Sequence, residues 1–110
     1  MLSRPKLRIN ADVTIEIDDP VGVVAPSGDD EHKKITWKIE VTNSGAKLDV
    51  LTSDVMLHTA DGQEYFLLGY QSVPPNSRRR INLSYEVPAN ALPAQLVITL
   101  GGGSTEVEIG

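Results

Sequence analysis

Residues 7–17 read Leu-Arg-Ile-Asn-Ala-Asp-Val-Thr-Ile-Glu-Ile, a stretch in which every second side chain is apolar. This alternation is the period of a strand that turns one face to a core and the other to solvent. A helix of the same sequence would spread its apolar side chains all around its axis. The stretch therefore predicts a β-strand, which Asp18-Asp19-Pro20 would end.

The same alternation returns at Ile35–Val41, Ile81–Val87 and Leu96–Leu100. Turn-forming residues recur roughly every ten positions between such segments, a spacing typical of sandwiches and barrels. Trp37 lies in phase with its apolar neighbours and is expected in the core. We count seven or eight strands and no helix of useful length. The sequence predicts an all-β, immunoglobulin-like antiparallel β-sandwich.

Several connections between the predicted strands contain residues typical of turns and loops. Residues 19–33 read as a long loop, within which Val21–Val24 could form a short edge strand. Asp61-Gly62 is the strongest hairpin signal and would join residues 55–59 to residues 64–68. The remaining expectations are a turn at Pro74–Ser77, a single helical turn at Ala89–Leu92 and a hairpin loop at Gly101–Ser104.

Composition limits the class of protein. The 110 residues suffice for one domain, residues 1–110, with residues 1–5 expected as a disordered tail. The formal net charge of −5 and the pI of about 4.8 argue against nucleic acid and anionic membranes as partners. No apolar run approaches the ~20 residues of a membrane span, and the first residues have no apolar signal core. The chain is therefore expected in the cytoplasm, or outside it after removal of an export segment.

Catalytic equipment is not apparent. The chain has no cysteine and only two histidines, His32 and His58, neither of which has a second histidine at a metal-binding spacing. His58 falls on the outward phase of its strand and is interpreted as a surface histidine. No Gly-x-Ser-x-Gly nucleophile motif is present. We expect a protein without enzymatic activity and without a cofactor.

Two acidic clusters flank the long loop, Asp18-Asp19 on one side and Asp29-Asp30-Glu31 on the other. Loop carboxylates can supply the hard oxygen ligands of calcium, so Asp18, Asp19, Asp29, Asp30 and Glu31 are candidate cation ligands. A solvated acidic loop is the favoured interpretation, because the ligand order of a calcium-binding loop is missing.

The only basic run is Arg78-Arg79-Arg80, directly before a predicted strand. Alternation would place Arg78 and Arg80 on one face and Arg79 on the other. The run could dock an acidic partner, or it could protect an exposed strand from edge pairing, which is the favoured interpretation.

An aromatic group follows the Asp61-Gly62 turn. Alternation requires one of Tyr65 and Phe66 to point outward, and with Leu67, Leu68 and Tyr70 they could form an exposed patch for a partner. Packing under the long loop is the competing and favoured interpretation.

Three stretches together resemble a known family: residues 37–45 (Trp-Lys-Ile-Glu-Val-Thr-Asn-Ser-Gly), 55–65 (Val-Met-Leu-His-Thr-Ala-Asp-Gly-Gln-Glu-Tyr) and 81–88 (Ile-Asn-Leu-Ser-Tyr-Glu-Val-Pro). Their order is similar to bacterial and archaeal immunoglobulin-like domains related to the mycobacterial immunoprotective extracellular protein, with Tyr85 in place of the usual Phe. The resemblance covers roughly residues 7–100. It implies a secreted or lipid-anchored sandwich of unknown function without catalytic residues. The late-embryogenesis-abundant type 2 sandwich, which would imply a stress role, is a weaker match.

These observations favour a non-enzymatic extracytoplasmic module that binds another protein through a sheet edge, the long loop, Arg78–Arg80 or the aromatic group at Tyr65 and Phe66. The alternative is a structural or assembly subunit of a larger surface or secreted complex, which would pair with itself through edge strands. A calcium-binding sandwich and a small hydrolase are less favoured.

Overall fold

The computed structural model describes residues 6–19, 21–100 and 102–109. Within these ranges the chain forms eleven β-strands, paired antiparallel, and no helix. The predicted all-β antiparallel sandwich is confirmed. The strands outnumber the predicted seven or eight, because the single strand expected over residues 7–17 is divided into β1 and β2, and the three-residue strand β8 was not expected. In chain order they are β1 (Lys6–Arg8), β2 (Val13–Ile17), β3 (Val23–Pro26), β4 (His32–Asn43), β5 (Leu48–Val50), β6 (Val55–Thr59), β7 (Glu64–Tyr65), β8 (Gln71–Val73), β9 (Ser77–Pro88), β10 (Pro93–Leu100) and β11 (Gly103–Glu108).

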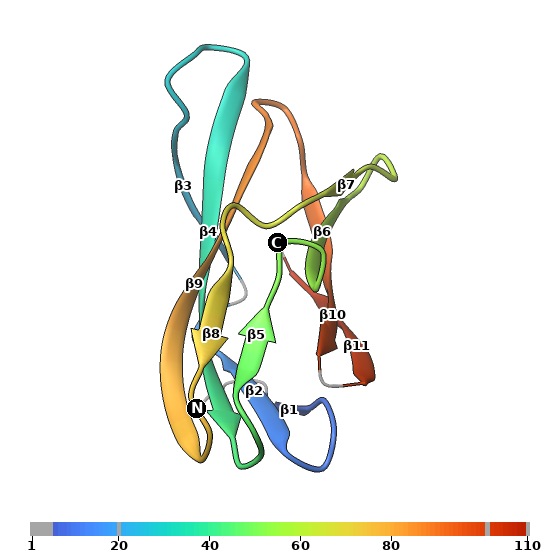
Figure 1. Ribbon diagram of the computed structural model, residues 1–110. Helices are drawn as coiled ribbons and strands as arrows, with labels where there is room; N and C mark the ends of the chain where they lie inside the picture. The colour runs from blue at the N-terminus through green and yellow to red at the C-terminus, as the bar shows by residue number, and fades with distance from the viewer. Residues whose placement is uncertain (1–5, 20, 101, 110) are drawn as a thin grey trace.

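The first layer is built around β4. Strand β9 pairs with β4 along its whole length, His32–Asn43 against Ser77–Pro88. On the other side of β4, β3 pairs with residues 33–36 and β2 pairs with residues 39–43. These two strands therefore lie one after the other along the same side of β4. Strand β1 pairs with β2 and completes the five-stranded sheet. The turn of the β3–β4 hairpin projects at one end of the molecule (Figure 1).

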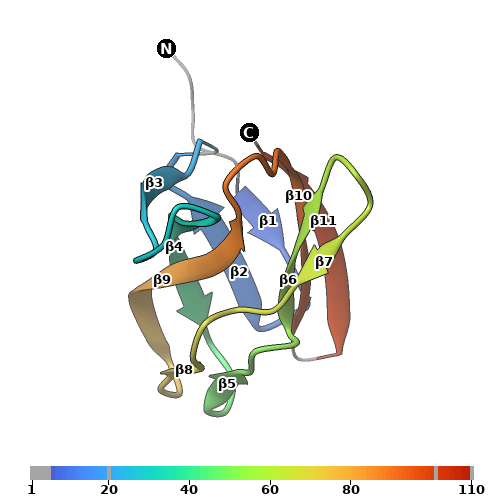
Figure 2. The same ribbon diagram turned by 90° about the horizontal axis from the view of Figure 1, so that it is seen from above.

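The second layer has the strand order β11-β10-β6-β7. Strands β5 and β8 form a separate two-stranded ribbon beside the two layers. Seen from above, the sheet with β4 and β9 faces the sheet with β6 and β10, and the core lies between them (Figure 2). No described segment is a helix long and apolar enough to cross a membrane.

The core contains one aromatic pair surrounded by aliphatic side chains. Trp37 from β4 and Tyr85 from β9 are buried, with ring centroids 5.9 Å apart and an edge-to-face angle of 65°. The Tyr85 hydroxyl donates a 2.8 Å hydrogen bond to the Val55 carbonyl of β6 and so joins the two layers. The prediction that Trp37 is a core aromatic is confirmed.

The prediction of one continuous strand over residues 7–17 is wrong, because the chain reverses direction between β1 and β2. The Asn10 side-chain oxygen accepts hydrogen bonds from the N–H groups of Asp12 (2.7 Å) and Val13 (2.9 Å), which fixes a tight turn. The N–H of Ile9 donates to the carbonyl of Val13 across this turn. Ile9 and Val13 on either side of the turn are both buried, so the alternation continues in phase across it. The apolar pattern alone therefore does not reveal the turn.

The Asp61-Gly62 hairpin is confirmed, with Gly62 at a φ of 84° that a glycine adopts without strain. Its second strand, β7, ends at Tyr65 and does not continue to Leu68. The predicted edge strand within the long loop is present as β3. The predicted turn at Pro74–Ser77 is confirmed between β8 and β9.

The predicted helical turn at residues 89–92 is wrong, and the predicted loop at residues 101–104 is only partly described. Residues 89–92 form no helical turn; a hydrogen bond from the Ala91 N–H to the Pro88 carbonyl closes a simple turn there. Gly101, in the predicted glycine loop, lies outside the described residues, and so do residues 1–5 of the predicted tail. Strands β10 and β11 pair up to Leu100 opposite Gly103, as expected for a hairpin.

The first and last hairpins touch. A Cβ atom placed on Gly103 would lie 2.0 Å from the carbonyl oxygen of Ile9, so only glycine fits this approach. The Asn10 amide also donates a 3.4 Å hydrogen bond to the Leu100 carbonyl. These contacts hold the edge of the first layer against the second.

Candidate interaction surface

Three large apolar side chains stand exposed on the segment between β7 and β8. Phe66, Leu68 and Tyr70 are 61%, 47% and 72% exposed, respectively. We call these three residues the apolar ridge. Tyr65 is half-buried against the core, so Phe66 is the member of that pair that points outward, as alternation requires. The favoured expectation that this group packs under the long loop is wrong for the ridge.

The backbone beneath the ridge is fixed at two points, one in the connection between β5 and β6 and one in β9. Leu67 is buried, and its N–H donates a 3.0 Å hydrogen bond to the Thr52 carbonyl. The next N–H, that of Leu68, donates a 2.8 Å hydrogen bond to the Ser84 carbonyl of β9. The segment thereby crosses from the layer of β7 to that of β9, as Figure 1 shows. Phe66 and Leu68 are thus presented by an anchored segment.

The arginine run belongs to β9 and does not precede it. Arg80 lies 3.2 Å from Asp18 and 3.8 Å from Glu40, and Arg78 lies 3.7 Å from the same Glu40. Arg79 is exposed on the opposite phase, opposite Val41, so the predicted division of the run between two faces is confirmed. Two of the three charges are thus partly neutralised within the sheet.

The two acidic clusters do not meet. Asp18 pairs with Arg80, whereas Asp29 lies beside Glu86, six residues farther along β9. Six residues of strand span about 20 Å, too far for one cation to bridge. Asp19 is occupied in a local turn, because its carboxylate accepts a 2.9 Å hydrogen bond from the Val21 N–H. One cation therefore cannot bind both clusters, and the favoured interpretation of a solvated acidic loop stays a prediction.

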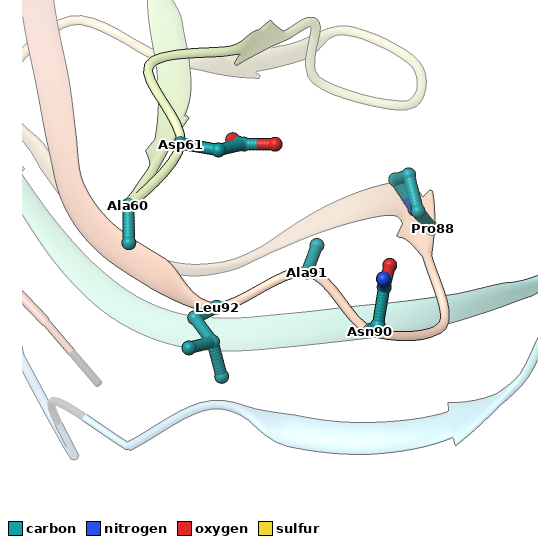
Figure 3. A pocket seen from close by; sticks show the side chains of 6 residues that line it. All are labelled: Ala60, Asp61, Pro88, Asn90, Ala91 and Leu92. Atoms are coloured by element: carbon teal, nitrogen blue, oxygen red, sulfur yellow. The ribbon is translucent and has the colours of Figure 1, made fainter.

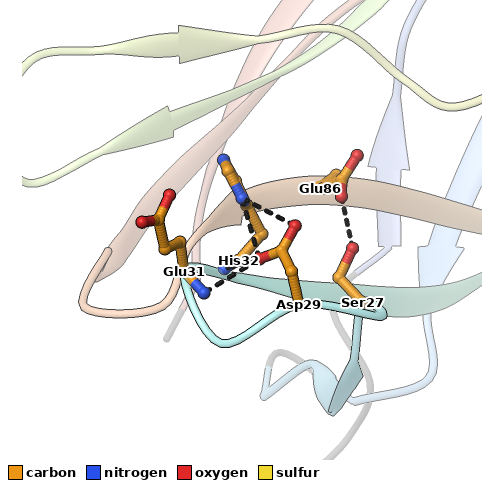
Figure 4. Close-up of polar contacts among 5 residues, drawn as sticks. All are labelled: Ser27, Asp29, Glu31, His32 and Glu86. Carbon is orange, nitrogen blue, oxygen red and sulfur yellow. Dashed lines mark hydrogen bonds and ion pairs between the residues drawn. The ribbon is translucent and has the colours of Figure 1, made fainter.

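The structure groups Asp29 instead with His32 and Glu86 (Figure 4). Their potential ligand atoms lie within 4.8 Å of one another, and all three side chains are exposed. The Asp29 carboxylate accepts hydrogen bonds from the N–H groups of Glu31 and His32, which lower the pKa of Asp29 together with the His32 side chain. The Ser27 hydroxyl donates to Glu86. The three residues could each supply one metal ligand, and Glu86 was beyond sequence reasoning because it joins from a strand more than fifty positions away.

The second histidine sits on β6 across from β7. His58 Nε2 lies 3.4 Å from a carboxylate oxygen of Glu64, and the side chain is about one-third exposed. The interpretation of His58 as a surface histidine agrees with this position.

A shallow depression of about 220 Å³ lies where the β6–β7 turn meets the connection from β9 to β10 (Figure 3). It is lined by Ala60, Asp61, Pro88, Asn90, Ala91 and Leu92. Asp61 is its one ionisable side chain, and the Thr59 hydroxyl and the Gln63 N–H that donate to its carboxylate lower the pKa of Asp61. The Asp61 carboxylate is held ionised by hydrogen bonds within its own turn. Among the described residues that line the depression, none is of a type suited to act as a nucleophile or base beside it.

The fold and the surface define an antiparallel β-sandwich with a fixed apolar ridge. No family model matches the sequence, and no curated protein matches it significantly. Three solved structures share the fold. YcdA of Bacillus subtilis, a candidate lipoprotein, superposes with a TM-score of 0.68 at 16% identity over 98% of this chain. An uncharacterized β-sandwich protein of Clostridium difficile gives a TM-score of 0.60 at 14% identity over 99% of this chain and 92% of its own.

The third structure is MPT63, a secreted protein of Mycobacterium tuberculosis. It superposes with a TM-score of 0.55 at 13% identity over 96% of this chain and 92% of its own. The present chain spans only 39% of YcdA, so most of YcdA lies outside the matched region. The resemblance inferred from the three sequence motifs is supported as far as the β-sandwich fold, because identities this low speak for the fold alone.

Proposed function

We propose that this chain is a non-enzymatic, extracytoplasmic protein-interaction module that binds its partner through the apolar ridge. The observation that carries the proposal is the exposure of Phe66, Leu68 and Tyr70 on a segment whose backbone is hydrogen-bonded to the β5–β6 connection and to β9. A group of exposed apolar side chains that do not pack in the core often marks an interaction site. Aromatic residues in such sites often contribute much of the binding free energy.

The anchoring of the segment matters as much as its composition. A flexible loop loses conformational entropy when it binds, whereas a pre-organised one loses little. Leu67 occupies the core and the N–H groups of Leu67 and Leu68 are hydrogen-bonded, so the ridge is already in a defined conformation. Such a surface suits a partner with a complementary apolar face.

The other parts of the proposal have separate support. A location outside the cytoplasm, within the immunoglobulin-like family suggested by the three motifs, is supported by two structural neighbours, a candidate lipoprotein and a secreted protein. The proposal assigns no catalytic role to the depression near Asp61, which has one ionisable side chain in its lining.

Site-specific photo-crosslinking in cells of the native organism tests the proposal. A photoreactive amino acid replaces Phe66 in one variant and Leu92 in a matched control, which is 67% exposed on a different connection. We expect one discrete protein adduct at position 66 and none at position 92. Adding Tyr70→Ser to the first variant should reduce the adduct, because the ridge acts as a unit.

An equal set of adducts at both positions, or none at position 66, would overturn the proposed surface. The compartment is tested on the same cells with a membrane-impermeant amine reagent. Labelling of the chain in intact cells is expected, and labelling only after lysis would contradict an extracytoplasmic location.

A further inference from the structure

Strand β3 has one partner only. Its residues Val23–Pro26 pair with residues 33–36 of β4, and no described strand pairs with its other side. Both views place β3 at the margin of its sheet (Figures 1 and 2). Soluble proteins usually protect such an edge with lysines or a bulge. Here the strand is uncharged, and Pro26 at its end is the one protective residue.

The free edge is apolar on both faces. Val24 stands opposite Ile35 on the core side of the sheet, yet it is 59% exposed. Val23 stands opposite Thr36 on the outer side and is 67% exposed. A strand added along this edge would cover both valines while its backbone completed the sheet.

Negative charge surrounds the edge. The exposed residues Asp29, Asp30 and Glu31 form the turn that follows β3, and the exposed Asp19 precedes it. The basic residues that stand opposite β3, Lys33 and Lys34, belong to β4, on the far side of β3 from an added strand. Strands lie about 4.8 Å apart, so the backbone that carries these lysines would be about 10 Å from the added strand. That distance is comparable with the screening length in physiological salt.

We propose that β3 accepts an extended peptide of another protein as an additional strand. The peptide would have alternating apolar residues along Val23–Ala25 and lysine or arginine residues beside the turn formed by Asp29–Glu31. This inference concerns a surface separate from the apolar ridge. Its test is therefore independent of the test of the proposed function.

A second copy of the chain is a poor occupant of this edge. Antiparallel pairing of two β3 strands about a two-fold axis would bring the acidic turn of one copy toward Asp19 of the other. Like charges so placed oppose association, and the chain as a whole carries a net charge of −5. A partner with basic residues would instead be attracted electrostatically to the same surface.

The test uses a synthetic peptide, Lys-Lys-Lys-Val-Thr-Val-Thr-Val, titrated into the isotopically labelled protein and followed by backbone amide NMR. We expect saturable shifts in residues 21–36, with no comparable change in residues 66–70. A peptide N-methylated at alternate positions, and one with glutamates in place of lysines, should each bind at least about tenfold more weakly. Raising the salt concentration should also weaken binding.

A pair of matched variants locates the contact. Val24→Lys introduces a charge into β3, whereas Val21→Lys introduces the same charge at a similarly exposed valine outside the strand. Thermal melting of both variants verifies folding. Peptide binding should be lost in V24K and persist in V21K, and the triple substitution Asp29→Asn, Asp30→Asn and Glu31→Gln should weaken it.

Equal binding of the N-methylated peptide, unchanged binding in V24K, or shifts centred on the apolar ridge would each overturn the proposal. So would concentration-dependent dimerisation of the free chain that V24K abolishes, since the occupant would then be a second copy. Absence of any shift up to millimolar peptide would also count against it.

Discussion

The hydroxyl of Tyr85 in β9 donates a 2.8 Å hydrogen bond to the backbone carbonyl of Val55 in β6. The bond spans the sandwich and lies in the fully buried part of the core. A buried hydroxyl requires such a partner, because its desolvation is otherwise uncompensated. The aromatic ring that carries it also makes the edge contact with Trp37, so one residue links both layers and the central indole.

Replacing Tyr85 by Phe keeps the ring and removes the hydroxyl. We expect the free energy of unfolding to fall by about 1 kcal/mol, the usual net contribution of a hydrogen bond. For a domain of this size that corresponds to a decrease in Tm of roughly 4–8 °C. Urea unfolding and calorimetry measure the change. Tyr70→Phe, at an exposed tyrosine, is the matched control and should change little.

The same phenol predicts how stability depends on alkaline pH. Burial raises the pKa of Tyr85 above its ordinary value of 10.0. The folded state therefore keeps a proton that the unfolded state releases above that pH, and the stability associated with the neutral phenol is present below about pH 10 and declines as the pH rises. The stability difference between the natural protein and Tyr85→Phe should shrink between pH 9 and pH 11. A difference independent of pH would contradict the buried, neutral phenol.

The pattern of buried positions was predictable because it depends on period alone. Trp37 was placed in the core by its phase with Ile35 and Ile39, and all three are buried. The turn at Asn10 was not predicted because it retains the phase of the strands on either side. Its cause is a side-chain hydrogen bond to the backbone, which competes with an extended strand and leaves no trace in hydrophobicity.

The candidate surfaces were predictable only in part, because they depend on contacts between distant segments. Phe66 was a candidate from its phase relative to Tyr65, but its exposure depends on how the segment is anchored at Ser84. The ion pairs of Arg80 depend on the register of β9 with β4 and of β4 with β2. No local pattern contains that register, so the sequence left both docking of an acidic partner and protection of an exposed strand open for the arginines.

Gly103 tests the contact between the first and last hairpins. Gly103→Ala would place a methyl group against the carbonyl oxygen of Ile9, a backbone atom that can yield only if the hairpin moves. We expect the free energy of unfolding to fall by roughly 1–3 kcal/mol, the cost of forcing extra volume into a packed contact. Ser104→Ala, at the exposed neighbouring residue, controls for the change in the strand and should have a small effect. Chemical denaturation of both variants gives the comparison, and equal stabilities would contradict the close approach.

The arginine run offers a test within three consecutive residues. Arg80 lies within ion-pair distance of Asp18 and Glu40, whereas Arg79 is exposed on the other phase of the strand. Arg80→Ala should lower the free energy of unfolding by about 0.5–1 kcal/mol in low salt, since exposed ion pairs contribute little more than that. The loss should diminish in 1 M salt, where screening has already weakened the pairs. Arg79→Ala should have a smaller effect that does not depend on salt. If the two variants instead respond alike to salt in thermal unfolding, the ion pairs of Arg80 contribute nothing specific, and its charge remains as available to an acidic partner as that of Arg79.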